Sequence, residues 1–162
     1  MDIVPEFIDK VTFSKLTCTN EKYNELVKNG YSMNKIKAIL HNHALLKVRE
    51  KINKDEECFV DQFCDVDLYY SYIQNEPKIL NKKITFETKG ESKYPSVAVA
   101  SMIARYSFLK EMEVLEQRYA MKLPKGASTT VDEVAQRFKD KYGSNELLKI
   151  SKSNFKNLEK IK

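Results

Sequence analysis

A carboxylate placed just ahead of a proline-started helix is the feature that most constrains how this chain folds. The segment runs from Glu91 to Leu109, and Pro95 presets the backbone φ at the start of its helical part. The first turns of this helix are made almost entirely of small residues, namely Ala98, Ala100, Ser101 and Ala104. Because small side chains let a helix press its backbone close to a sheet, we expect a sheet beneath it and Glu91 where strand and helix ends converge.

Composition indicates one globular domain. With 162 residues, 42% of them hydrophobic, and only four Gly and four Pro, the chain can bury a core. The net charge of +5 suits a polyanionic partner, although an excess of Lys is also a common solubility device. The three cysteines form no CxxC pair, which favours a reduced intracellular protein over a zinc site. No apolar run approaches the roughly 18 residues of a membrane span, and no export signal is evident. These features predict a cytoplasmic protein.

Strand patterns occur in residues 1–94, whereas residues 95–162 are mainly helical in pattern, and no linker or repeat divides the 162 residues. Period-two alternation predicts a strand over Val11–Cys18. Glu57–Phe63 is continuously apolar like a strand covered on both faces, and Ile84–Thr88 follows as the next strand. Strands that alternate with helices and then give way to helices indicate an α/β sheet with a helical C-terminal appendage.

Helix patterns are strongest over Met33–Asn53, where apolar residues recur at every fourth position. These residues are Ile36, Leu40, Ala44, Val48 and Ile52. Residues 2–10 are typical of a helix end, and Thr19 or Asn20 is expected to cap a short helix that stops near Gly30. A capping box over Thr130–Glu133 predicts an amphipathic helix closed by Gly143, with Ser144 and Ser151 as caps of two further helices.

Asp61 is the first candidate for chemistry, because it lies inside the apolar run Phe59–Phe63. A buried carboxylate is costly unless it is paired, hydrogen-bonded or bound to a cation. A helix that contains Leu68 and Tyr69 follows, so Asp61 could equally end the strand and cap that helix. The residue alone leaves both interpretations open.

Glu91 is the second candidate, although an acid near a helix start also interacts favourably with the helix dipole. Asp61 and Glu91 follow two consecutive predicted strands, so one sheet edge can hold both. Carboxylate oxygens there suit Mg²⁺ or Mn²⁺. Two carboxylates are too few for two-metal phosphodiester cleavage, which needs several oxygen ligands.

Several segments together resemble the type 2 ribonucleases H, and in particular the ribonuclease HIII branch. They are the Glu91–Leu109 segment, Asn20–Leu26, Met33–Asn42, Lys122–Ser128 and Ser153–Asn157. The Val-Asp-Gln-Phe setting matches Asp61 to the family's third acidic ligand, and Glu91 matches the fourth. The resemblance implies a ribonuclease H-like α/β fold with a mixed sheet flanked by helices, and hydrolysis of the RNA strand of RNA–DNA hybrids with Mg²⁺ or Mn²⁺.

The family's first two acids form an Asp-Glu-x-Gly dyad that has no counterpart in this sequence. Asp55-Glu56 and Asp132-Glu133 both lack the required Gly, and we reject them. The resemblance therefore implies the C-terminal part of the catalytic domain, without the dyad strand and the N-terminal substrate-binding domain. The parent enzyme is expected to be a monomer without a small-molecule cofactor, and this chain alone is expected to be inactive. The alternative is a non-catalytic nucleic-acid-binding or interaction domain that uses the same fold.

Basic and aromatic residues add weaker candidates. Basic side chains near the predicted site could contact phosphates, and these are Lys89, Lys93, Arg105 and Lys125. Lysines at 149, 152, 156 and 160 form a basic tail or simply a solvated face. Tyr69, Tyr70 and Tyr72 could stack on bases but are more typical of a core. His41 and His43 are two apart on a helix and so point to different faces, which argues against a shared metal.

Overall fold

The chain divides into two compact units. A computed structural model describes residues 3–54, 56–80, 84–155, 158 and 161. Unit 1 comprises Met1–Leu16 and Ser32–Phe108, and unit 2 comprises Thr17–Tyr31 and Leu109–Lys162. The assignment of residues 1–162 to a single domain stays a prediction.

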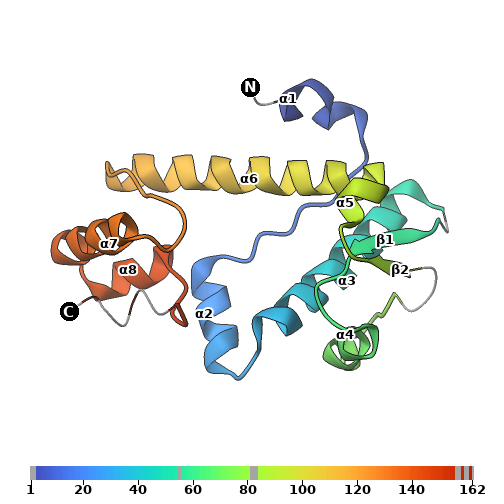
Figure 1. Ribbon diagram of the computed structural model, residues 1–162, viewed down its shortest axis with the longest axis horizontal. Coiled ribbons are helices and arrows are strands. Elements are labelled where there is room, and N and C mark those ends of the chain that lie inside the picture. Colours follow the sequence, from blue (N-terminus) through green and yellow to red (C-terminus); the bar gives the residue numbers. More distant parts are fainter. Residues whose placement is uncertain (1–2, 55, 81–83, 156–157, 159–160, 162) are drawn as a thin grey trace. The chain divides into compact units, whose positions relative to one another are not determined.

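Unit 1 combines a small parallel sheet with helices (Figure 1). Its elements are α1 (Val4–Phe7), the 3₁₀ turn η1 (Ile8–Lys10), α3 (Met33–Ile52), β1 (Cys58–Asp61), α4 (Val66–Ile73), β2 (Ile84–Glu87), α5 (Gly90–Lys93) and the first part of α6 (Pro95–Tyr119). β1 and β2 lie side by side and pair in parallel. The predicted strands over Glu57–Phe63 and Ile84–Thr88 are therefore present, and the α/β class is confirmed.

The core of unit 1 lies where α4 packs against α3 and the sheet. Ala38, Tyr69 and Ile73 are completely buried. The Tyr69 ring meets Phe86 of β2 edge-on at 4.9 Å between centroids, and Phe63 at 6.2 Å. Of the three tyrosines of α4, Tyr69 is therefore a core residue. Aromatic side chains at helical spacing commonly pack in a core.

Helix α3 buries the predicted face only in part, and its fully buried residues extend to another side of the helix. Of the five predicted positions only Ile36 is buried, and the most deeply buried residues of α3 include Ala38 and Asn42. Residues four apart are offset by about 40° around a helix. A row of apolar residues at every fourth position therefore winds around the helix and cannot all face the same neighbouring element. The Asn42 side chain is fully buried, donates to the Lys78 carbonyl (2.8 Å) and accepts from the Leu80 N–H (2.9 Å). It thereby fixes the connector that leads to β2.

The predicted strand over Val11–Cys18 is wrong. The segment has no regular secondary structure, and its first residue has an extended backbone, with Val11 at φ −123° and ψ 141°. An extended segment becomes a strand only when another strand supplies hydrogen bonds. No described strand pairs with it, and the Phe13 carbonyl instead accepts a hydrogen bond from the Lys51 ammonium at 2.6 Å.

Helix α6 begins at Pro95 as predicted, but its small residues do not pack on the sheet. Ala100, Ser101 and Ala104 are exposed and Ala98 is partly buried, whereas Ile103 is buried. Burying a large aliphatic side chain removes more apolar surface from water than burying an alanine does. Three of the four small residues are therefore not in a contact face, and the expectation of a small-residue contact face is wrong for them.

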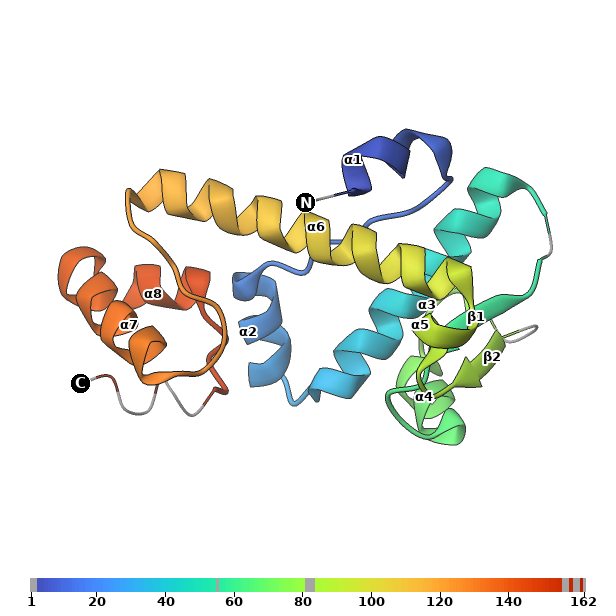
Figure 2. The same ribbon diagram turned by 45° about the horizontal axis from the view of Figure 1, so that its top comes forward.

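Unit 2 consists of helices. Its elements are α2 (Asn20–Lys28), the second part of α6, α7 (Thr129–Tyr142) and α8 (Ser144–Ile150). Figure 2 shows α7 beside α8, joined by the sharp turn at Gly143, whose φ is 87°. Phe138 of α7 is completely buried and contacts the rings of Tyr119 and Tyr142, each at 4.8 Å between centroids.

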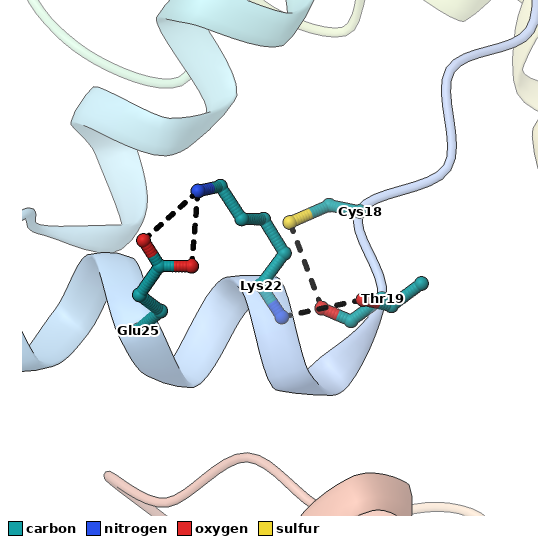
Figure 3. Close-up of polar contacts among 4 residues, drawn as sticks. All are labelled: Cys18, Thr19, Lys22 and Glu25. Atoms are coloured by element: carbon teal, nitrogen blue, oxygen red, sulfur yellow. Dashed lines mark hydrogen bonds and ion pairs between the residues drawn. The ribbon is translucent and has the colours of Figure 1, made fainter.

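The N-terminus of α2 is capped as predicted (Figure 3). The Thr19 hydroxyl accepts from the Lys22 N–H at 3.2 Å, and the Lys22 ammonium donates to both oxygens of Glu25 at 3.0 Å. Asn24 then joins α2 to the end of α8, because its amide donates to the carbonyls of Leu148 and Ser151.

Gly143 closes α7 as predicted, but the predicted N-caps Thr130, Ser144 and Ser151 are wrong. Helix α7 starts two residues earlier than the capping box implied, with Ser128 as N-cap and Thr130 inside the helix. Ser144 is the first residue of α8 rather than its cap. Ser151 lies at the C-terminal end of α8, where its hydroxyl donates to the Leu147 carbonyl. Ser and Thr bond to nearby backbone groups at both helix ends, so their presence does not fix which end they mark.

Within the described ranges, no helix combines the length and the apolar character needed to cross a membrane.

Candidate active site

The two parallel strands place acidic residues at one edge of the sheet. The register pairs Cys58 with Ile84 and ends by pairing Asp61 with Glu87, so both strands finish on a carboxylate. The Gln62 N–H extends the ladder by donating to the Glu87 carbonyl at 3.0 Å. Carboxyl ends of parallel strands are common locations of ligand sites in α/β proteins.

A tight turn after β2 brings the Glu91 segment to Asp61. Lys89 adopts the left-handed conformation (φ 56°), and the next residue, Gly90, donates its N–H to the Asp61 Oδ1 at 2.9 Å. A Cβ at position 90 would lie 3.3 Å from the Asp61 Cα and 3.5 Å from the Val97 Cγ1. Only glycine allows this close approach without displacing its neighbours. Glu91 is therefore the residue directly after Gly90, whose N–H binds the Asp61 carboxylate.

An aromatic stack fixes the other end of this turn. The Tyr94 ring lies over Phe59 of β1 with 4.0 Å between centroids and 23° between planes. The Tyr94 N–H also donates to the Gly90 carbonyl at 2.9 Å, which closes the single turn of α5. The segment that carries Glu91 is therefore attached to β1 at both ends, by a hydrogen bond and by stacked rings.

Asp61 does not cap the following helix. The N-cap of α4 is Asp65, whose Oδ1 accepts from the Asp67 N–H at 2.9 Å. The alternative interpretation of Asp61 as a helix cap is therefore wrong.

Asp61 and Glu91 are both exposed, and neither makes an ion pair within the described part of the chain. The Gly90 N–H occupies only one oxygen of Asp61, so the carboxylates offer the hard oxygen donors that Mg²⁺ and Mn²⁺ prefer. No group of three or more His, Cys, Asp or Glu residues able to hold a metal ion occurs among the residues that the structure describes. The assignment of Asp61 and Glu91 as metal ligands therefore stays a prediction.

Two histidines of α3 point in different directions, as predicted. His43 pairs with Glu76, with 2.7 Å between Nε2 and Oε2. His41 packs edge-on against Phe63 at 5.1 Å between centroids. Burial, followed by the nearby Lys37 ammonium, lowers the pKa of His41, whereas the Asp61 carboxylate acts in the opposite direction. His41 therefore lies within the electrostatic field of Asp61 and is mostly neutral at pH 7.

The four basic candidates have different surroundings. Lys89 is exposed at the turn after β2, and Lys93 pairs with Glu87, an ion pair that raises the pKa of the lysine. The Arg105 guanidinium lies 5.6 Å from the centroid of the Phe108 ring. Lys125 belongs to unit 2, in the loop before α7. Of the basic tail, Lys156 and Lys160 lie outside the described residues.

Sequence reasoning missed Glu87, Gly90 and Tyr94. Glu87 could have been found from its position at the end of a predicted strand. Gly90 precedes Glu91, but a glycine at a strand end usually suggests only a turn. The stacking of Tyr94 on Phe59 has no signal in the sequence, because it depends on the register of two separate strands.

Comparison with known proteins gives the family. Residues 1–158 match the model of the family described as Ribonuclease HII. A ribonuclease HIII from Phytoplasma mali is 44% identical over 160 residues, covering 99% of this chain and 55% of the relative. A ribonuclease HIII from Bacillus mycoides is 40% identical over 161 residues, covering 98% of this chain and 52% of the relative.

Solved structures agree with this. The crystal structure of Bst-RNase HIII in complex with Mn²⁺ matches with a TM-score of 0.94 and 36% identity, covering 97% of this chain and 52% of that one. The crystal structure of Aquifex aeolicus RNase H3 matches with a TM-score of 0.58 and 29% identity, covering 82% of this chain and 45% of that one. The chain thus spans about half the length of the relatives that it matches.

Proposed function

Because this chain belongs to the ribonuclease HII family, we propose that it forms part of a ribonuclease HIII that hydrolyses the RNA strand of RNA–DNA hybrids. Asp61 and Glu91 are the proposed metal ligands. The observation that carries this assignment is the Gly90–Asp61 hydrogen bond, which joins the segments of the two carboxylates at the strand ends. The relative crystallised with Mn²⁺ supports use of a divalent ion.

The residues of this chain have distinct proposed roles. Gly90 holds the Asp61 carboxylate in one orientation through Oδ1 and leaves the second oxygen for an ion. The Tyr94–Phe59 stack keeps α5 against β1, and so positions Glu91. Lys93 neutralises Glu87, which lowers the negative charge beside Asp61. When bound, Mg²⁺ or Mn²⁺ would supply a more acidic water and stabilise charge on the leaving oxygen.

Metal binding tests the ligand assignment directly. We expect Mn²⁺ to bind the 162-residue chain weakly, because two carboxylates supply few of the six or so ligands that such an ion needs. Asp61→Asn and Glu91→Gln should each weaken binding at least tenfold, whereas Asp67→Asn, an exposed acid on α4, should leave it unchanged. Isothermal titration calorimetry measures this, and equal affinities for all four proteins would contradict the assignment.

A cleavage assay separates the enzyme from the alternative, a non-catalytic nucleic-acid-binding domain. With two candidate ligands among the described residues, the chain alone should cleave hybrids negligibly in excess Mn²⁺. Mixing it with the part of the Bacillus mycoides relative that it does not cover should restore cleavage, and Asp61→Asn should abolish the restored activity. Turnover by the purified chain alone that survives Asp61→Asn would overturn the proposal.

A further inference from the structure

The loop between α6 and α7 forms one wall of a groove in unit 2. The groove has a volume of about 450 Å³. Apolar side chains line part of it, and these are Met121, Leu123, Pro124 and Val134. Polar and charged side chains line the remainder, and these are Glu116, Lys122, Lys125, Thr130 and Arg137.

The charges that line the groove do not cancel. Glu116 is matched locally, since its carboxylate accepts from the Lys122 ammonium (2.8 Å) and from the Leu123 N–H (2.9 Å). Lys125 and Arg137 make no ion pair or hydrogen bond within the described part of the chain, although the charge of Lys125 helps to lower the pKa of Glu116. Three cations against one carboxylate leave the groove with an excess of two positive charges. Two unpaired cations beside an apolar wall suit an anion attached to an apolar body.

We propose that this groove binds a backbone phosphate of nucleic acid, with Lys125 and Arg137 as its cations and the apolar wall against the adjoining sugar. This inference rests on the proposed function, because that function makes nucleic acid the polyanion to be bound. Lysine and arginine are the usual phosphate-binding side chains, and such contacts carry no sequence information. The groove should therefore accept an RNA–DNA hybrid and duplex DNA alike.

Salt dependence of binding provides the test. Each phosphate contact releases condensed counterions, so the logarithm of the binding constant falls with the logarithm of salt concentration by about 0.9 per contact. Fluorescence anisotropy with a labelled RNA–DNA hybrid would be measured at several salt concentrations for the 162-residue chain, Lys125→Gln, Arg137→Gln, the double variant and Lys28→Gln. Lys28 is an exposed lysine of α2 in the same unit that does not line the groove.

We expect each single variant to raise Kd by about threefold to tenfold at low salt and to reduce the salt slope by about one. The double variant should lose about twice as much slope, and Lys28→Gln should match the parent chain. Amide NMR signals of Gly126 and Thr130 should shift on addition of the hybrid, and the double variant should abolish the shift. A double variant with the parent slope would overturn the proposal, as would displacement of the hybrid by equimolar inorganic phosphate at constant ionic strength.

The two proposals fail separately. If Asp61→Asn leaves Mn²⁺ binding intact but the Lys125 and Arg137 variants lose salt slope, the metal site is wrong and the groove stands. If Asp61→Asn weakens Mn²⁺ binding but the Lys125 and Arg137 variants keep the parent salt slope, the groove proposal is wrong and the metal site stands. Both Lys125 and Arg137 are exposed, so circular dichroism of the variants should match that of the parent.

Discussion

Unit 1 and unit 2 differ in charge and in how they hold their polar groups. Unit 1 contains 14 Lys and Arg against 13 Asp and Glu, whereas unit 2 contains 14 against 10. In unit 1, individual hydrogen bonds hold particular polar groups in place. Examples are the Gly90–Asp61 hydrogen bond and those of the fully buried Asn42. In unit 2, Lys125 and Arg137 lie exposed beside an open groove.

This contrast separates two requirements of a nuclease. Metal ligands must be held in fixed positions, because coordination tolerates little displacement. Phosphate contacts by flexible cations act through charge and tolerate movement. In the two proposals, the sheet of unit 1 holds the metal ligands, and the helices of unit 2 hold the phosphate-binding cations. The predictions that follow test whether the two units really differ in rigidity and in independence.

Phe138→Ala should have the largest effect. Phe138 is completely buried between the rings of Tyr119 and Tyr142, and truncating a buried Phe costs about 3–5 kcal/mol of unfolding free energy. If the units unfold independently, hydrogen exchange of the Gly90 amide in unit 1 should stay slow while the amides of α7 exchange rapidly. If amides in both units lost protection from hydrogen exchange, the two units would not unfold independently. Phe155→Ala, at an exposed phenylalanine of unit 2, is the control.

Gly90→Ala should have the next largest effect. The new methyl group would meet the Asp61 Cα at 3.3 Å, and overpacking of this kind costs about 1–3 kcal/mol. Gly126→Ala in the loop of unit 2 meets nothing within 4 Å and is strained only by its φ of 103°, so it should cost about 1 kcal/mol. Chemical denaturation gives both values. A larger loss for Gly126→Ala would show that the loop, not the site, is the tightly packed region.

Tyr69→Phe should stabilise unit 1 slightly. Among the described residues the buried Tyr69 hydroxyl has no hydrogen-bond partner, and burial raises the pKa of this phenol above its ordinary value. Removing an unsatisfied hydroxyl should increase the unfolding free energy by about 1 kcal/mol. The matched change in unit 2 is Tyr142→Phe. The Tyr142 hydroxyl donates to the Tyr119 carbonyl, so its removal should lower the unfolding free energy. Destabilisation by both would indicate an unseen partner of Tyr69.

A pH effect in unit 2 should be the smallest. The hydrogen bonds from Lys122 and Leu123 lower the pKa of Glu116 below its ordinary value of 4.5. A lowered folded-state pKa gives stability that is present above pH 4.5 and lost as the pH falls through the folded-state value. The difference in melting temperature between the parent and Glu116→Gln should therefore shrink on acidification from pH 6. A melting-temperature difference that grows on acidification would indicate that folding raises the pKa of Glu116 instead of lowering it.

Local patterns in the sequence predicted most elements, and pairing in space accounts for the errors. The Thr19 cap, the length of α3, the start of α6 at Pro95 and both paired strands follow from residues close together in the chain. The strand predicted over Val11–Cys18 failed because a strand also needs a neighbour. The small residues of α6 failed as a contact face because the burial of Ile103 decides which side turns inward.

The candidate site was predictable only in part. Asp61 could be singled out as a carboxylate inside an apolar strand, and Glu91 as an acid just after the next predicted strand. Their joining through the Gly90 N–H depends on a left-handed residue at Lys89, for which the sequence has no clear signal. The Tyr94–Phe59 stack depends on the geometry of the finished sheet. Fixed geometry at a site therefore required the structure, whereas its acidic chemistry did not.

Asn42 has a consequence for how much sequence variation α3 can accept. One fully buried side chain both donates to the Lys78 carbonyl and accepts from the Leu80 N–H. Asp lacks the donor, Leu lacks both groups, and Gln places them one methylene too far. A library randomised at this codon and selected for folded protein should recover asparagine, whereas the codon of exposed Lys47 on the same helix should return nearly any residue.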